Sequence, residues 1–450
     1  KNMSQNYLIK NVFVASEGYY DIYDVLIEAP FITKIERCID NLPQNVIEID
    51  GTDKILIPGM IDDQVHFREP GLIHKGDIYT ESKAAIAGGI TSYMEMPNTK
   101  PPAITIEELE KKYGIAAQKS FANYSFYLGA SNDNIDEIKK ADYNNICGVK
   151  VFLGSSTGDL LVDDPKSIER LFAECPTLIA AHCEDDRIIK KNLDKITDEY
   201  GFDLPSYFHP IIRNEEACYA SSKFAVETAK KYNTRLHILH ISTAKELNLF
   251  TNKIPLKEKK ITAEVCIHHL WFSDEDYDQL GNKIKWNPAI KTRYDRDKIL
   301  EAVNTDIIDV IATDHAPHTL EEKNKPLLEA PSGGPLVQHA LLALLDLYQQ
   351  NKISLETLVR KTSHSVADMF AIENRGYIEE GYYADVVLVN LNETTEVKKD
   401  NLFYKCGWSP FEGYTFSSKI EKTFVNGYLV YDNGKVNEEL HSMRLKFKRK

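Results

Sequence analysis

The sequence contains no long apolar run and has a deficit of positive charge. No stretch approaches the roughly 20 uninterrupted apolar residues that span a bilayer, and residues 1–9 lack the apolar segment of a secretory signal. Lysine and arginine total 54 against 68 aspartate and glutamate, and the formal net charge of −14 argues against a nucleic-acid or anionic-membrane partner. The sequence therefore predicts a soluble protein of the cytoplasm.

Paired cysteines and internal repeats are missing as well. The seven cysteines are odd in number and include no Cys-x-x-Cys pair, which argues against a disulfide framework and against a structural zinc ribbon. No repeat, low-complexity tract or long Pro/Ser linker stands out, so repeat scaffolds are disfavoured. At 450 residues, the chain is long enough for several domains or for one large barrel with an accessory domain.

Both ends of the chain read as short strands separated by turns. Near the N-terminus these are 12–14, 24–27 and 31–35; near the C-terminus they are 384–389 and 423–431, the latter leading into an Asp432-Asn433-Gly434 turn. We expect the two ends to form one small β-sandwich domain, with 1–55 and 371–450 as its two parts. A barrel would then occupy residues 56–370.

The middle of the chain alternates short apolar strands with longer amphipathic segments, as in βα units around a parallel sheet. Eight strands are predicted, at 56–67, 91–96, 125–129, 148–153, 178–182, 236–241, 262–272 and 310–313. Helices are predicted at 79–87, 106–118, 166–174, 215–230, 295–304 and 336–349. This pattern favours an α/β fold of the (β/α)8 TIM-barrel type, although an open doubly wound sheet alternates in the same way.

Residues that can bind metals stand at the ends of five of these strands. They are His66, Lys150, His182, His240 and Asp314. Taken singly, a histidine at a strand end is more often a structural residue than a ligand, and a lysine is more often solvated. Five from five strands argue for a shared site, because the carboxyl ends of barrel strands meet at one face. Imidazole and carboxylate are ligands of zinc-like divalent ions.

Several ordered motifs then make the pattern specific. They are Pro58-Gly59-Met60-Ile61-Asp62, His66-Phe67-Arg68-Glu69-Pro70-Gly71, Met96-Pro97-Asn98-Thr99, Gly148-Val149-Lys150-Val151-Phe152, Ala181-His182, His237-Ile238-Leu239-His240, Asn287-Pro288-Ala289-Ile290-Lys291 and Ala312-Thr313-Asp314-His315-Ala316-Pro317-His318. In this order and spacing, they resemble the dihydroorotases of the amidohydrolase superfamily, over nearly the whole chain.

The resemblance implies a metal centre. Lys150 would carry a carboxylate derived from carbon dioxide and bridge two positions for zinc, of which one or both are filled. His182 and His240 would hold one ion, and His66 with Asp314 would help hold the other. A carbamylated lysine is chemically reasonable because an unmodified ammonium would repel divalent ions and has no lone pair to donate.

The resemblance also implies a reaction of pyrimidine biosynthesis on a small-molecule substrate, the reversible cyclisation of N-carbamoyl-L-aspartate to L-dihydroorotate. Metal-bound hydroxide would attack the ring carbonyl, with Asp314 as general base and acid. Arg68, Asn98 and His318 would bind the substrate carboxylate, and Asn287 would face the polar edges of the ring. A homo-oligomer is compatible with the sequence.

One position departs from the family pattern. Gln64 stands where the first histidine of a His-x-His pair is usual, and an amide is a poor zinc ligand, so the ion near Gln64 should bind more weakly. Three alternatives stay open. They are a sister cyclic amidase such as an allantoinase or dihydropyrimidinase, an inactive scaffold of the same fold, and a generic barrel binding module. The segment 154–158 after Lys150 is either a lid or an ordinary loop.

Overall fold

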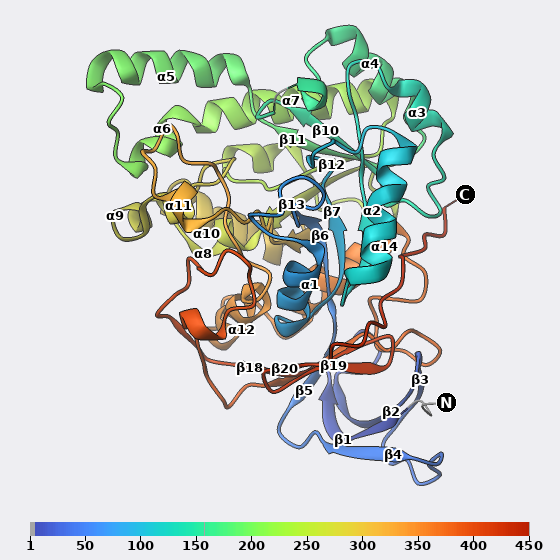
Figure 1. Cartoon of the computed structure of the whole chain (residues 1–450). Helices are drawn as coiled ribbons and strands as arrows, with labels where there is room; N and C mark the ends of the chain where they lie inside the picture. Colours follow the sequence, from blue (N-terminus) through green and yellow to red (C-terminus); the bar gives the residue numbers. More distant parts are fainter. Residues whose placement is uncertain (1–4, 157, 450) are drawn as a thin grey trace.

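The computed structural model describes residues 5–156 and 158–449, which form a barrel of parallel strands and a second, mixed sheet (Figure 1). In Figure 1, blue strands from the start of the chain and red strands from its end lie together below the barrel. The predicted combination of an α/β barrel with a β layer built from both ends of the chain is confirmed.

Within the described residues, eight parallel strands form the wall of the barrel, if β8 and β9 are taken as one strand. Their bounds are β6 (Met60–Val65), β7 (Ile90–Glu95), β8 (Asn123–Phe126) with its continuation β9 (Leu128–Gly129), β10 (Val149–Leu153), β11 (Ile179–Cys183), β12 (Leu236–Ile238), β13 (Ile261–Cys266) and β14 (Val310–Ala312). Each pairs with the next in sequence order. A parallel bridge between Val65 and His315 joins the last strand to the first and closes the barrel.

Helices alternate with the strands and cover the outside of the barrel. They are α1 (Ile78–Ala87), α2 (Ile106–Lys119), α3 (Ile135–Lys140), α4 (Pro165–Glu174), α5 (Asp186–Tyr200), α6 (His209–Ile212), α7 (Glu215–Tyr232), α8 (Ile267–Trp271), α9 (Tyr277–Leu280), α10 (Arg293–Asn304), α11 (Leu320–Lys323), α12 (Ala340–Gln349), α13 (Leu355–Val359) and α14 (Ser365–Phe370). Side-chain caps begin several of them. Thr105, Asp164 and Asn214 accept hydrogen bonds from the first turns of α2, α4 and α7. No helix in the described part of the chain has the length and apolarity to cross a membrane.

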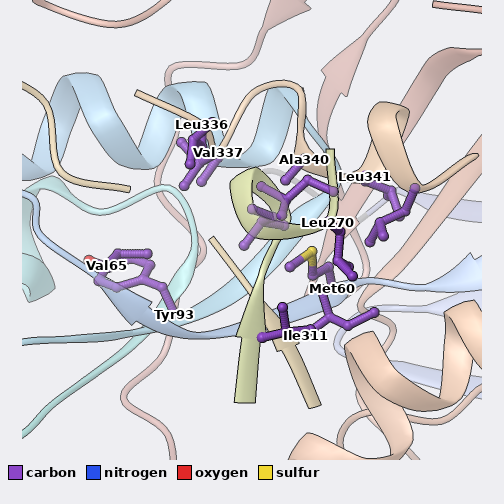
Figure 2. Packing of buried hydrophobic residues seen from close by; sticks show 14 of the residues in the cluster. Met60, Val65, Tyr93, Leu270, Ile311, Leu336, Val337, Ala340 and Leu341 are labelled. Atoms are coloured by element: carbon purple, nitrogen blue, oxygen red, sulfur yellow. The ribbon is translucent and has the colours of Figure 1, made fainter. Parts of the chain in front are cut away.

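The helix α12 packs over the seam of the barrel, which is the place where β14 meets β6. Figure 2 shows Met60 of β6 and Ile311 of β14 beside Leu270 of α8 and Leu341 of α12, and each of these side chains is at most 2% exposed. Burying one such side chain contributes about 1.5–3 kcal/mol. The predicted helix at 336–349 begins later than expected, at Ala340, because Leu336 to His339 form a preceding turn that packs into the same cluster.

The second sheet combines strands from both ends of the chain in the order β20-β19-β18-β15-β5-β1-β2-β3, with β4 also paired to β1. Their bounds are β1 (Asn6–Val14), β2 (Asp21–Glu28), β3 (Phe31–Glu36), β4 (Val46–Asp50), β5 (Ile55–Pro58), β15 (Val386–Asn390), β18 (Lys419–Val425), β19 (Tyr428–Asp432) and β20 (Lys435–Val436). A separate hairpin joins β16 (Thr395–Glu396) to β17 (Thr415–Phe416). The domain limits 1–55, 56–370 and 371–450 remain a proposal.

Three predicted strands are corrected by the structure. The expected strand 56–67 is divided at Gly59, where a side chain would collide with Thr91; β5 pairs with β15, and β6 enters the barrel. The expected strand 262–272 ends at Cys266 and continues as α8, because an apolar run alone does not distinguish strand from helix. The run 423–431 is a hairpin that turns at Asn426-Gly427, whose φ angles are 51° and 79°.

Candidate functional site

His66 and Asp314 meet where the barrel closes between β6 and β14. His66 Nε2 lies 3.1 Å from Asp314 Oδ1, and His66 Nδ1 lies 2.8 Å from Asn98 Oδ1. Gln64 Nε2 donates to the same Asp314 oxygen at 3.3 Å. Burial raises the pKa of Asp314 to about 7, although the Lys150 ammonium opposes this shift. Burial also holds the pKa of His66 well below its usual range, so its imidazole is neutral and keeps a lone pair.

Lys150 is buried on β10 among apolar groups. Its Nζ lies 3.6 Å from Met96 Sδ and 4.4 Å from the centre of the Phe152 ring. Burial lowers its pKa to about 8, and the carboxylates of Asp314 and Glu264 limit the shift. A larger fraction of this amine than of an exposed lysine is therefore neutral near physiological pH, and the neutral form is the one that reacts with carbon dioxide.

His182 and His240 face each other across β11 and the segment that follows β12. Their ring centres are 4.5 Å apart and their planes stand at 79°. Burial, together with the neighbouring His182, holds the pKa of His240 well below its usual range, so this imidazole is also neutral. Both rings are buried, and His182 Nε2 lies 2.7 Å from Glu184 Oε1. A carboxylate at this nitrogen orients the ring and leaves Nδ1 as its ligand atom.

Glu184 and Arg213 were not predicted from the sequence. Arg213 donates two hydrogen bonds to the Glu184 carboxylate, from Nε to Oε2 at 3.0 Å and from Nη2 to Oε1 at 2.9 Å. Ser155 Oγ donates to Glu184 Oε1 at 2.9 Å and also contacts Arg213. Glu184 follows His182 by two residues, which was an available signal, whereas nothing in the sequence marks Arg213. Of the segment 154–158, Thr157 lies outside the described residues.

Arg68 and His318 lie together beside the seam. Arg68 Nη2 lies 3.1 Å from His318 Nε2, and Arg68 Nε donates to the carbonyl of Pro317 at 3.0 Å. Lys75 Nζ lies 2.8 Å from His318 Nδ1. Burial lowers the pKa of Arg68 to about 10, so the guanidinium still carries its charge at neutral pH. The pair presents a planar cation suited to a carboxylate.

Asn98 and Asn287 line one open cavity of about 670 Å³ together with Ser155 and Arg213. Asn287 Oδ1 accepts a hydrogen bond from Ser332 Oγ at 3.1 Å. A larger cavity of about 920 Å³ lies elsewhere, between the second sheet and the segment 348–357. We assign the site to the smaller cavity because Asn98, which lines it, is bonded to His66, and Arg213, which also lines it, is bonded to Glu184.

Two side chains next to the strand-end residues are held by hydrogen bonds inside the barrel. Asp62 accepts from Thr313 Oγ1 at 2.6 Å inside the barrel, and His315 Nε2 lies 3.0 Å from Glu81 Oε1. His237 joins Asp63 and Glu264 in a buried cluster whose ligand-type atoms lie within 4.8 Å of one another.

The donor set at the strand ends fits a divalent ion. It offers His66, His182 and His240 as imidazoles, Asp314 as a carboxylate, and Lys150 as a lysine with a depressed pKa. Nitrogen and oxygen donors of this kind suit zinc. Gln64 adds only an amide, and its Nε2 is already directed at Asp314.

Comparisons of the sequence reveal a family. Residues 55–430 match the amidohydrolase family. The chain is 32% identical to a dihydroorotase of Methanothermobacter thermautotrophicus over 399 residues, which cover 87% of this chain and 88% of that protein. It is also 32% identical to a dihydroorotase of Pyrococcus furiosus over 426 residues, which cover 93% and 90%.

Comparisons of the structure reveal the same fold. An L-hydantoinase (dihydropyrimidinase) from Arthrobacter aurescens superimposes with a TM-score of 0.90 at 22% identity, covering 98% of this chain and all of that one. A dihydropyrimidinase from Brevibacillus agri superimposes with a TM-score of 0.88 at 22% identity, covering 99% and 100%. At this identity, the likeness concerns the fold alone.

Proposed function

Because the chain belongs to the amidohydrolase family, we propose that it is a dihydroorotase, which reversibly cyclises N-carbamoyl-L-aspartate to L-dihydroorotate in pyrimidine biosynthesis. The observation that carries this proposal is the similarity to dihydroorotases, 32% identical over 87% of the chain in one case and over 93% in another. The hydantoinases share the fold at 22% identity and favour no other substrate. A cytoplasmic location and a homo-oligomeric state remain predictions.

In this proposal, Lys150, His182 and His240 hold one zinc ion, and His66 and Asp314 with a carbamylated Lys150 hold a second. When bound, such an ion polarises the scissile carbonyl and acidifies water. The depressed pKa of Lys150 supports carbamylation, and the neutral imidazoles of His66 and His240 support ligation.

Asp314 moves the proton. In hydrolysis, water adds to the ring carbonyl carbon, the ring C–N bond breaks, and the departing nitrogen takes a proton. Asp314 accepts the proton from the attacking water and delivers it to that nitrogen, and cyclisation reverses both transfers. Burial raises the pKa of this carboxyl group above its usual range, which favours uptake of a proton.

Arg68 binds the free carboxylate of dihydroorotate, with Asn98 and His318 beside it and Asn287 at the ring. The contact of Arg68 with His318 supports this arrangement, because substrate would meet the two side chains together. Asn98 also bonds to His66, so it links the substrate pocket to a proposed metal ligand.

A substrate panel tests the proposal. Purified protein loaded with zinc should open dihydroorotate and close N-carbamoyl-L-aspartate, with a kcat/KM well above that for dihydrouracil, hydantoin or allantoin. Comparable rates on allantoin or dihydrouracil would favour a sister amidase. Absence of turnover on every member of the panel, with the metal bound, would favour the inactive scaffold.

The position of Gln64 predicts two unequal ions. We expect the ion held by Lys150, His182 and His240 to bind first, and the second to be sub-stoichiometric after purification, with activity rising on addition of divalent metal. Gln64→His should tighten the second ion and reduce the dependence on added metal, as measured by equilibrium zinc titration. Two equally tight ions in the natural protein would contradict this expectation.

The Glu184 carboxylate predicts a second effect on metal affinity. Glu184→Gln removes the charge that orients His182 and pairs with Arg213, so zinc affinity should fall about 10- to 100-fold in competition with a chelator. Glu216→Gln, at an exposed carboxylate paired with Lys245, is the matched control and should leave affinity unchanged. Equal affinities in both variants would remove Glu184 from the site.

A further inference from the structure

Asp63, His237 and Glu264 point toward one another in the barrel interior, on β6, β12 and β13. All three side chains are completely buried. His237 Nε2 lies 2.9 Å from Asp63 Oδ2 and 3.8 Å from Glu264 Oε2. None of the three belongs to the proposed strand-end site, so the cluster needs an explanation of its own.

No lysine or arginine of the described chain forms an ion pair with the two carboxyl groups of the cluster. Within the described residues, the ion-pair partner of Asp63 and of Glu264 is His237 alone. Asp63 Oδ1 and Glu264 Oε2 have no hydrogen-bond partner in the same part of the chain. Leaving ionised carboxylate oxygens unpaired in a dry interior is energetically unfavourable. A positive species between the three side chains would remove that cost.

The surrounding contacts prepare these atoms for coordination. His237 Nδ1 lies 2.7 Å from Thr262 Oγ1, which can accept a hydrogen bond from Nδ1–H and leave the Nε2 lone pair directed into the cluster. Glu264 uses its other oxygen, Oε1, to accept from the backbone N–H of His240 at 2.9 Å and from Cys266 Sγ at 3.2 Å. Its Oε2 therefore remains free to act as a ligand.

We propose that Asp63, His237 and Glu264 bind a divalent cation of the zinc class in the barrel interior, at a site separate from the strand-end residues. One imidazole and two carboxylates are a suitable donor set for such an ion, and its charge offsets both carboxylates. The ion ties β6, β12 and β13 together and, through Glu264, holds the backbone of His240 in place.

A shared proton is the rival explanation. Burial and the adjacent Asp63 raise the pKa of Glu264 well above its usual range, so a protonated Glu264 could donate to Asp63. The two explanations differ in metal content, because a shared proton requires no ion.

Metal counting in a double variant separates them. His66→Ala/His182→Ala removes one ligand from each strand-end position and leaves the cluster intact. After loading with zinc and gel filtration, we expect this protein to keep one zinc per chain by mass spectrometry of the metal. Adding Asp63→Asn should remove it, whereas Asp62→Asn, at a buried carboxyl group bonded to Thr313, should not. A zinc-free double variant that folds normally would overturn the proposal.

Crystals of the unaltered protein give a second measurement that needs no variant. Anomalous diffraction at the zinc edge should place a peak between Asp63, His237 and Glu264, and the absence of that peak in zinc-soaked crystals would overturn the proposal even if the variants fail to fold. The proposal does not depend on the substrate. Turnover of dihydroorotate with an empty cluster would refute the interior ion alone, and an occupied cluster without turnover would refute the dihydroorotase alone.

Discussion

Asp314→Asn is expected to abolish turnover of dihydroorotate and of N-carbamoyl-L-aspartate alike. The asparagine amide neither takes up the proton nor coordinates as a carboxylate does, and loss of a general acid–base group costs about 10²- to 10⁴-fold by itself. The same carboxyl group also lies 3.1 Å from His66, a proposed metal ligand. We therefore expect kcat to fall by about 10⁴-fold or more. Initial rates in both directions, at saturating metal, provide the measurement.

Asp62→Asn is the matched control for Asp314→Asn. Asp62 is a fully buried aspartate close by, and burial raises its pKa to about 7, so an amide mimics the neutral acid. It contacts Thr313 rather than His66, and its replacement should retain most of the activity if the protein remains folded by circular dichroism. Rates near those of the unaltered protein in Asp314→Asn would refute the proposed proton transfer.

Two contacts among the strand-end residues could be anticipated from the sequence because barrel geometry brings the ends of neighbouring strands together. His66 and Asp314 lie 248 residues apart in the chain and are in contact, since a bridge from Val65 to His315 closes the barrel beside them. His182 and His240 likewise meet because β11 and β12 are parallel neighbours. In such a fold, position along a strand is sufficient to predict which residues share a face.

The residues that contact the strand-end side chains from loops and from the barrel interior could not be predicted in the same way. Arg213 reaches Glu184 from the turn between α6 and α7, and no periodic pattern fixes where a long side chain from a connection will point. The cluster of Asp63 with His237 depends on an irregular register between β6 and β7 around residues 62–65. All residues of β6 are buried, so burial and alternation alone could not show which of Asp62 and Asp63 meets His237.

The predicted strand 262–272, which in fact continues as the helix α8 after Cys266, was wrong for a related reason. The run from Ile261 to Phe272 is mostly apolar in both its strand and its helix, so periodicity could not locate the change at Cys266. By contrast, the Asn426-Gly427 turn carried a recognisable hairpin signal, because both residues adopt positive φ there. A prediction that weighted this dipeptide would have divided β18 from β19 correctly.

Arg68→Met is expected to reduce kcat/KM for dihydroorotate about 10²- to 10³-fold while leaving bound zinc unchanged. Losing a charge-assisted contact to a carboxylate costs a few kcal/mol, and each 1.4 kcal/mol is about tenfold. Methionine preserves much of the side-chain length but offers no donor to His318 or to substrate. The kcat/KM of Arg68→Lys should lie between those of the unaltered protein and Arg68→Met, because lysine keeps the charge and loses the planar fork.

Dihydrouracil provides the control that separates recognition from damage. It has the same ring without the carboxylate, so Arg68→Met should leave its slow turnover nearly unchanged if Arg68 reads that group. A parallel fall for both substrates, with metal content intact, would mean that Arg68 instead supports the local structure through the carbonyl of Pro317. Unaltered kinetics on dihydroorotate would exclude Arg68 from the site. Another cation near His318 would then have to bind the carboxylate, and Lys75, whose Nζ lies 2.8 Å from His318 Nδ1, is a candidate.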